Sequence, residues 1–303
     1  MKETVVQVLT AFVVLLCIFI SSCMLDGGFY EYYDDESPAT PVINEEPDTF
    51  DQKPAFEVHF IDVGQADAAL VICDEKAMLI DGGNKADSQR MYTYLEKNNI
   101  DYLDYVVATH VHEDHIGGIA GALSYADFGT VYCNTANNDS DLFYDLKKQV
   151  EKAGKSILVP NAGDTFDLGS AHVFIVSRME SDNENNSSIV LKVVYGDTSF
   201  LFTGDIEKEA EDSIVRSKTD IKTTVLKVAH HGSENSTLYP FLVAASPKFA
   251  IISTGENEYG HPSEDTLERL RIVEAECYRT DICDDIVCVS DGKSVKFSFA
   301  NKT

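Results

Sequence analysis

The chain is organised around the stretch Thr109-His110-Val111-His112-Glu113-Asp114-His115-Ile116-Gly117-Gly118. Three of the eight histidines in the chain and one aspartate fall within six consecutive positions, directly after the apolar run 105–108. A strand that ends in a polar turn brings neighbouring side chains together. Imidazole and carboxylate groups together suit zinc, manganese or iron better than calcium. The stretch therefore predicts a metal-binding loop at the end of a strand, followed by a helix.

The spacing of these side chains divides them between two ions. His110 and His112 are expected to hold one ion, and Asp114 and His115 a second. Two ions a few ångströms apart clamp the attacking and leaving oxygens of a hydrolysis. The alternative is a polar surface loop that happens to contain histidine, but the crowding of three histidines here argues against it.

The stretch resembles the HxHxDH motif of metallo-β-lactamase-fold hydrolases. The words Asp62-Val63-Gly64-Gln65-Ala66-Asp67-Ala68 and Leu79-Ile80-Asp81-Gly82-Gly83 resemble one branch, the extracellular hydrolase domain of ComEC-type competence (DNA-uptake) channels and its free-standing relatives. The resemblance covers about residues 56–299. It implies an α/β (α+β) fold, a four-layer αββα sandwich, two divalent metal ions (zinc or manganese) and a phosphodiester substrate.

Later words of the sequence add ligand candidates. Asp205 ends the run Phe200-Leu201-Phe202-Thr203-Gly204 and matches the strand-end Gly-Asp of the superfamily, where a carboxylate can bridge two cations. His230 and His231 follow the predicted strand 224–229. Adjacent residues on a strand point to opposite faces, so only one of them should ligate directly. We expect His230 to bind the second ion and His231 to contact the substrate.

The other predicted site residues have supporting roles. His261 is expected to complete the second metal site or to protonate the leaving group as a general acid. By the resemblance, Asn186 and Ser188 hydrogen-bond a substrate phosphate, and a solvated turn is the alternative for both. Asp114 is also expected to orient the nucleophile. Asp81 matches the first motif of the superfamily, which implies that it supports the ligand loop by hydrogen bonds rather than binding metal.

The sequence departs from the wider superfamily in two respects. Most dinuclear members carry a third histidine on the first ion, but the only histidine between His115 and His230 is His172, at the start of a predicted strand. We interpret His172, and His59 inside the first strand, as structural. The first ion site is then under-ligated, with water or substrate filling it. His112 also occupies a position where the competence-type branch often has Asp.

The N-terminus predicts export. Residues 4–20 are almost entirely apolar and follow Lys2, as in a secretory signal. The word Ile20-Ser21-Ser22-Cys23 resembles a lipoprotein box, which implies a signal peptide at 1–22 and a lipid anchor at Cys23. An uncleaved transmembrane anchor is the alternative. Residues 23–52 then form an acidic disordered tether, and 53–303 a hydrolase domain at the extracellular face of the bacterial cytoplasmic membrane.

Charge narrows the choice of substrate. The formal net charge of −27 disfavours broad electrostatic binding to nucleic acid, which needs Lys and Arg to neutralise phosphates. Nuclease action on DNA and hydrolysis of a smaller or cell-wall diester therefore both stay open. The non-enzymatic alternative is an anchored binding module with a vestigial metal site. The retained ligand set argues against that alternative.

The C-terminal part predicts a small closing sheet. The segments 276–279, 286–289 and 295–299 each read as a strand. Cys277 and Cys288 lie at mirrored positions about the turn near Cys283, so a disulfide across a hairpin is a hypothesis for an exported protein.

Overall fold

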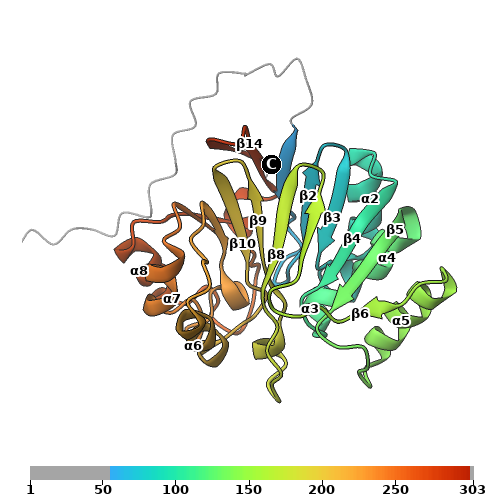
Figure 1. The fold of residues 1–303 in the computed structure, drawn as a ribbon, viewed down its shortest axis with the longest axis horizontal. Helices are drawn as coiled ribbons and strands as arrows, with labels where there is room; N and C mark the ends of the chain where they lie inside the picture. The colour runs from blue at the N-terminus through green and yellow to red at the C-terminus, as the bar shows by residue number, and fades with distance from the viewer. Residues whose placement is uncertain (1–54, 301–303) are drawn as a thin grey trace, which may run out of the picture. The chain divides into compact units, whose positions relative to one another are not determined.

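The computed structural model describes residues 55–300, in which two β-sheets pack face to face and helices cover their outer faces (Figure 1). This arrangement confirms the predicted α/β class and the four-layer αββα sandwich. The predicted signal peptide 1–22 and tether 23–52, including Cys23, lie outside the described residues.

The first sheet combines an antiparallel half with a parallel half. Strands β1, β2 and β3 form an antiparallel meander, whereas β3, β4, β5 and β6 run parallel. In spatial order the strands are β15 (Val295–Phe299), β14 (Ile286–Ser290), β1 (Phe56–Phe60), β2 (Ala69–Cys73), β3 (Lys76–Ile80), β4 (Tyr102–Ala108), β5 (Asp127–Cys133) and β6 (Ile157–Leu158).

The second sheet repeats this plan. Strands β7, β8, β9 and β10 are antiparallel, and β10, β11, β12 and β13 run parallel. In spatial order the strands are β13 (Glu276–Arg279), β12 (Phe249–Ile252), β11 (Val225–Lys227), β10 (Thr198–Phe202), β9 (Val190–Tyr195), β8 (Ala171–Ser177) and β7 (Thr165–Leu168).

The helices lie outside the sheets, with α2, α4 and α5 beside the first sheet and α6, α7 and α8 beside the second (Figure 1). The helical segments are η1 (Lys85–Asp87), α2 (Ser88–Asn98), α3 (Glu113–Ile116), α4 (Ile119–Tyr125), α5 (Asp141–Lys152), η2 (Asn185–Ser187), α6 (Lys208–Ser217), η3 (Ala229–Gly232), α7 (Tyr239–Ala245), α8 (Glu264–Ile272) and α9 (Thr280–Cys283). Within residues 55–300, none of these helices has the length and apolar character needed to cross a membrane.

Three apolar layers hold the sandwich together, because each sheet buries both of its faces. The layer between the first sheet and its helices includes Leu79, Met91, Leu95, Leu103 and Phe143. The layer between the sheets includes Phe56, Phe60, Met78, Phe200 and Ile251. The layer outside the second sheet includes Leu201, Ile214, Leu226, Phe241 and Leu242. Each fully buried large side chain stabilises the fold by about 1.5–3 kcal/mol.

The C-terminal strands do not form the predicted small sheet. β13 extends the second sheet beside β12, whereas β14 joins the first sheet beside β1. The helical turn α9 carries the chain from one sheet to the other, so no hairpin links β13 and β14. The predicted disulfide is therefore wrong: Cys277 and Cys288 lie in different sheets and carry free thiols.

Backbone packing behind the ligand loop requires glycine at two positions. The amide of Gly118 donates to the carbonyl of Gly83 over 3.0 Å. A Cβ atom on Gly118 would lie 1.9 Å from the carbonyl oxygen of Gly82, and one on Gly117 would lie 2.3 Å from the amide nitrogen of Lys85. The glycines therefore let the helical segment after the histidines dock directly on the turn that follows β3.

We expect Gly118→Ala to lower the free energy of unfolding by about 1–3 kcal/mol, the usual cost of overpacking. The clash involves a backbone carbonyl, so no side chain can move aside to relieve it. Equilibrium urea denaturation measures the effect. Ser124→Ala, at an exposed position of α4, is the control and should change stability by less than about 0.5 kcal/mol. Equal stability of the two variants would contradict this account of the packing.

Candidate metal centre

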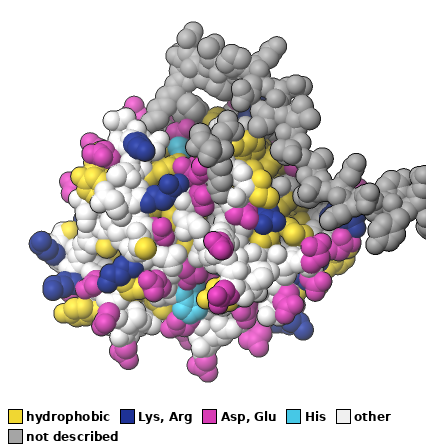
Figure 2. Space-filling view, turned by 180° about the vertical axis from the view of Figure 1, so that it is seen from behind, with side chains coloured by type: hydrophobic (Ala, Val, Ile, Leu, Met, Phe, Trp, Pro, Cys, Tyr) yellow, Lys and Arg dark blue, Asp and Glu magenta, His cyan; other side chains and the backbone are white. Residues whose placement is uncertain are grey.

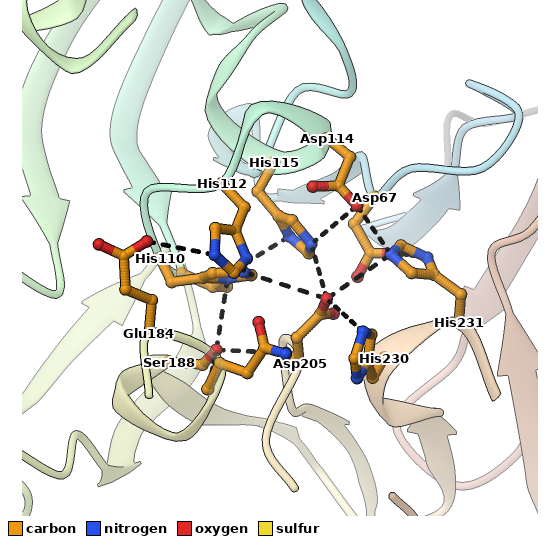
Figure 3. Close-up of polar contacts among 12 residues, drawn as sticks. Asp67, His110, His112, Asp114, His115, Glu184, Ser188, Asp205, His230 and His231 are labelled. Carbon is orange, nitrogen blue, oxygen red and sulfur yellow. Dashed lines mark hydrogen bonds and ion pairs between the residues drawn. The ribbon is translucent and has the colours of Figure 1, made fainter. Parts of the chain in front are cut away.

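The predicted ligands meet at one edge of the sandwich, where the parallel strands end (Figure 3). The loop after β4 carries the HxHxDH residues, the loop after β10 carries Asp205, and η3 follows β11. The carboxyl ends of parallel strands share one edge of a sheet, which explains why segments distant in sequence converge there. The residues brought together are His110, His112, Asp114, His115, Asp205, His230 and His231.

His110 and His112 form the first pair of donors. His110 Nε2 and His112 Nδ1 lie 2.9 Å apart. Two ligands of one tetrahedral zinc ion lie roughly 3.3 Å apart, given zinc–nitrogen bonds of about 2 Å. The pair therefore fits a shared ion, in agreement with the sequence-based assignment.

Asp114, His115, Asp205 and His231 form the second group. His115 Nε2 lies 3.2 Å from Asp205 Oδ2 and 3.8 Å from Asp114 Oδ2. His231 Nε2 lies 3.2 Å from Asp114 Oδ2 and 3.7 Å from Asp205 Oδ2. One donor atom from each of the four residues lies within 4.8 Å of the others. Two imidazoles and two carboxylates at these separations suit one zinc or manganese ion.

Buried polar atoms without partners support the same conclusion. Among the described residues, His115 Nε2 and Asp205 Oδ1 are buried and lack a hydrogen-bond partner. Burial opposes a charge on Asp205, but His115 and His231 outweigh it and hold the pKa of the carboxyl well below its usual value. Burial likewise opposes a charge on His231, yet Asp205 and Asp67 raise its pKa to about 10. The protons on these imidazoles balance the negative charge of the carboxylates. A metal cation bound at the same place would balance that charge instead.

Each histidine of the centre has its other ring nitrogen near a polar partner, which fixes the ring orientation. His112 Nε2 lies 3.1 Å from Glu184 Oε2, and His230 Nδ1 lies 3.4 Å from Glu207 Oε1. The remaining contacts are His110 Nδ1 with the Thr109 and Ser188 hydroxyls, His115 Nδ1 with Asp81, and His231 Nδ1 with the Ser253 carbonyl oxygen. The inward-facing nitrogens are therefore available as ligands.

Asp81 has the supporting role that the sequence predicted. Its Oδ1 accepts the Thr109 amide over 2.8 Å, and its Oδ2 accepts the Thr109 hydroxyl over 2.7 Å. Asp81 Oδ2 also lies 2.9 Å from His115 Nδ1. One buried carboxylate thus ties the start of the ligand loop to its last histidine.

Sequence reasoning missed a buried ion pair behind the centre. Lys227 Nζ lies 2.8 Å from Asp67 Oδ1, and the same oxygen lies 3.3 Å from His231 Nδ1. Burial opposes a charge on Asp67, but Lys227 and His231 outweigh it and lower its pKa. The signal was present in the sequence, because a lysine within the apolar strand Val225–Lys227 needs a buried partner. Lys227 thus keeps the Asp67 carboxylate charged beside His231 Nδ1.

The strand before the two adjacent histidines is shorter than the predicted 224–229, and the histidines do not alternate as strand residues would. β11 ends at Lys227, and both His230 and His231 have left-handed backbone conformations, with φ of 49° and 53°. Both rings therefore face Asp205: His230 Nε2 lies 3.8 Å from Asp205 Oδ2. His231 is buried and belongs to the four-residue group, whereas the His230 side chain is 23% exposed. The geometry thus favours His231 as the ligand of the second ion and His230 as the substrate contact, the reverse of the sequence-based assignment.

A cavity of about 340 Å³ opens over the centre. Its lining includes His261, as predicted, but His261 lies outside the four-residue ligand group. Asn186 and Ser188 do not line it, and this corrects the prediction that they contact substrate. Asn186 Oδ1 accepts the amides of Glu207 and Ala210 at the start of α6, and Ser188 is buried against His110.

Asn185 takes the place of Asn186 at the cavity. Its Nδ2 donates to Glu207 over 3.1 Å, and its buried Oδ1 has no hydrogen-bond partner among the described residues. The 3-10 turn η2 determines which of the two asparagines faces inward.

The remaining histidines lie away from the centre, as predicted. His59 Nδ1 lies 2.8 Å from the Tyr94 hydroxyl, and His172 Nδ1 lies 2.6 Å from Asp167. His172 borders a larger cavity, of about 520 Å³, on the outer face of the second sheet near Phe174 and Lys192. None of the predicted ligands lines that cavity, so the chemistry belongs to the smaller one.

A family model confirms what the geometry indicates. The model of the metallo-beta-lactamase superfamily matches residues 61–256, which contain the whole ligand set. The chain belongs to the metallo-β-lactamase superfamily. Its ligand set and family identify a metal-dependent hydrolase in general terms.

Curated relatives confirm the resemblance to ComEC-type competence proteins. The chain is 30% identical over 246 residues to "ComE operon protein 3" of Bacillus subtilis. The aligned segment covers 74% of this chain and 32% of that protein. It is 29% identical over 224 residues to "Competence protein ComA" of Neisseria gonorrhoeae. That aligned segment covers 73% of this chain and 30% of that protein. The chain thus spans about a third of the length of the curated relatives it matches.

Solved structures confirm the fold. CmlA, a diiron beta-hydroxylase from Streptomyces venezuelae, superimposes with a TM-score of 0.54 at 12% identity, over 79% of this chain and 55% of that one. Igni18, a metallo hydrolase from the archaeon Ignicoccus hospitalis, gives a TM-score of 0.51 at 17% identity, over 76% of this chain and 98% of that one.

Metal titration of two variants tests the assignment of the adjacent histidines. We expect His231→Ala to weaken binding of one Zn²⁺ equivalent at least about tenfold more than His230→Ala, because only His231 belongs to the four-residue group. Isothermal titration calorimetry on the purified protein measures both affinities. His172→Ala is the control and should bind as the wild type does. A greater loss in His230→Ala would restore the sequence-based assignment.

Proposed function

We propose that this chain is a metal-dependent phosphodiesterase. The observation that carries the proposal is the Asp205 carboxylate, which belongs to the four-residue group and also lies 4.0 Å from His110 Nε2 of the first pair. A carboxylate in that position suits a centre with two divalent ions, an arrangement used for phosphoryl transfer to water. The likeness to the curated competence proteins supports a phosphodiester substrate.

The side chains around the cavity divide the reaction between them. When bound, divalent ions supply a water of lowered pKa and positive charge for the phosphoryl oxygens. Asp114, which lines the cavity, orients the attacking water and accepts its proton. The water oxygen bonds to phosphorus, the bond from phosphorus to the leaving oxygen breaks, and that oxygen leaves as an anion or takes up a proton from solvent.

His230 and His261 are neighbours in the lining of the cavity. Their ring centroids are 5.4 Å apart, and both line the cavity. Burial, followed by the charges of His230 and His231, lowers the pKa of His261 to about 4. A neutral His261 therefore donates a hydrogen bond to the phosphoryl or leaving oxygen, rather than a full proton at neutral pH.

Asp205→Ala tests the proposed activity. We expect hydrolysis of bis(p-nitrophenyl) phosphate by the manganese- or zinc-loaded protein to fall at least about a hundredfold, because the shared ligand is lost. Circular dichroism should show that the variant stays folded. Asp197→Ala, at the exposed turn before β10, is the matched control and should keep wild-type turnover. Full activity in Asp205→Ala would refute the mechanism.

We also propose that the protein is exported and lipid-anchored at Cys23, on the extracellular face of the cytoplasmic membrane. The support is the sequence Ile20-Ser21-Ser22-Cys23 after an apolar segment. A role in DNA processing at the cell surface is consistent with the competence proteins it resembles.

Replacement of Cys23 tests the anchor. We expect wild-type protein made in a bacterial host to incorporate radiolabelled palmitate and to sediment with membranes. Cys23→Ser should lose the label, because serine offers no thiol for lipidation. Cys277→Ser is the control and should keep it. Labelling that persists in Cys23→Ser would contradict the lipoprotein assignment.

A further inference from the structure

An exposed tyrosine marks the mouth of the catalytic cavity. Tyr259 lines the cavity, yet its side chain is 77% exposed to solvent. Its ring stacks on that of His261, with centroids 5.7 Å apart and an interplanar angle of 29°. Stacking covers one face of the Tyr259 ring and leaves the other open. An aromatic side chain in this position fits a flat group of the substrate.

The loop that carries Tyr259 is held in place before any ligand arrives. Asn257 Nδ2 donates to the carbonyl oxygens of Gly255 and His261, over 2.8 and 2.7 Å. Asn257 Oδ1 accepts the amides of Tyr259 and His261, each over 3.0 Å. One side chain thus uses its whole hydrogen-bonding capacity to pin both ends of the loop. Binding on Tyr259 therefore costs little ordering of the loop.

The cavity offers metal ligands for one phosphate and no cation for a second. None of the ten residues that line it is Lys or Arg. Glu113 lines it, and Glu184 and Glu207 border it through the histidines they contact; Glu256 and Glu258 precede Tyr259 in the sequence and are exposed. Figure 2 shows a patch of histidine surface in the lower half of the view, with acidic and hydrophobic side chains beside it. Each further phosphate of a polymer would meet carboxylates rather than the basic groups that bind nucleic acid.

The size of the cavity, like its charge distribution, favours a small substrate. Its volume of about 340 Å³ lies at the lower end of the range for small-molecule sites, about 300–1,000 Å³. It therefore accommodates one phosphodiester and one attached group.

We propose that Tyr259 and His261 form a platform for a nucleobase, and that the substrate is a small nucleoside phosphodiester with a single phosphate rather than a nucleic-acid polymer. This inference rests on the proposed phosphodiesterase activity and specifies its substrate class. The metal centre holds the phosphate, the Tyr259 ring stacks on the base, and the acidic border excludes neighbouring phosphates.

Two esters with the same leaving group separate base recognition from chemistry. The p-nitrophenyl ester of thymidine monophosphate and methyl p-nitrophenyl phosphate each carry one phosphate, but only the first has a base. We expect the metal-loaded full-length protein in detergent to prefer the thymidine ester by about tenfold in kcat/KM, the effect of one base–aromatic stack. Tyr259→Ala should abolish this preference and leave kcat/KM for the methyl ester unchanged. Tyr259→Phe should preserve it.

Tyr144→Ala, which removes an exposed tyrosine of α5, is the matched control and should keep the preference. An equal loss on both esters in Tyr259→Ala would mean that Tyr259 only maintains the site and would overturn the platform. Turnover of neither ester by metal-loaded wild-type protein would instead refute the phosphodiesterase itself. The two failures are thus distinguishable.

Substrate length tests the second half of the proposal. We expect kcat/KM per phosphodiester bond to be at least about tenfold higher for thymidylyl-thymidine, which carries one phosphate, than for a long single-stranded oligothymidylate at low salt. The difference should narrow as added salt screens the carboxylates. Equal or faster cleavage of the polymer would overturn the single-phosphate assignment and indicate a nuclease.

Discussion

A single buried carboxylate, that of Asp205, sets the conditions for the rest of the centre. Its Oδ2 lies between 3.2 and 4.0 Å from imidazole nitrogens of His115, His231, His230 and His110. An isolated buried carboxylate is costly, so cations must surround it. The strand ends of both halves of the sandwich supply those groups. The fold thus concentrates negative charge at one point and encloses it with metal-binding nitrogens.

The orientation of the imidazoles depends on contacts with acidic residues that surround the ligands. Asp81, Glu184, Glu207 and Asp67 each lie next to the ring nitrogen that faces away from the centre. Such contacts fix the tautomer and direct the other nitrogen inward. Lys227 supports these contacts, because its buried ion pair with Asp67 keeps that carboxylate charged. Acidic residues therefore serve two purposes here, as ligands and as partners of the histidines.

The acidic character of the protein also shapes what can enter. Near the ions, carboxylates raise the affinity for cations. At the cavity, Glu113, together with Glu184 and Glu207 beside its histidines, would repel any phosphate that bound ions did not hold. The relatives are named for competence, whereas this acidic border favours the small diester proposed above. A DNA substrate and a small diester would share the same proposed chemistry at phosphorus and differ only in what surrounds it.

The sequence by itself determined the fold class, the HxHxDH ligand loop, Asp205 and the supporting role of Asp81. These features depend on residue types at short spacings and on strands followed directly by loops, which a linear pattern preserves.

The tertiary structure decided between His230 and His231, between Asn186 and Asn185, and where the strands after β12 go. In η3 the left-handed backbone of both histidines, next to Gly232 packed against Pro262, turns both rings toward Asp205. Such backbone angles follow from packing between distant segments, which local periodicity does not encode. The same reason hid the pairing of Lys227 with Asp67, which are far apart in sequence and meet only when the two sheets pack together.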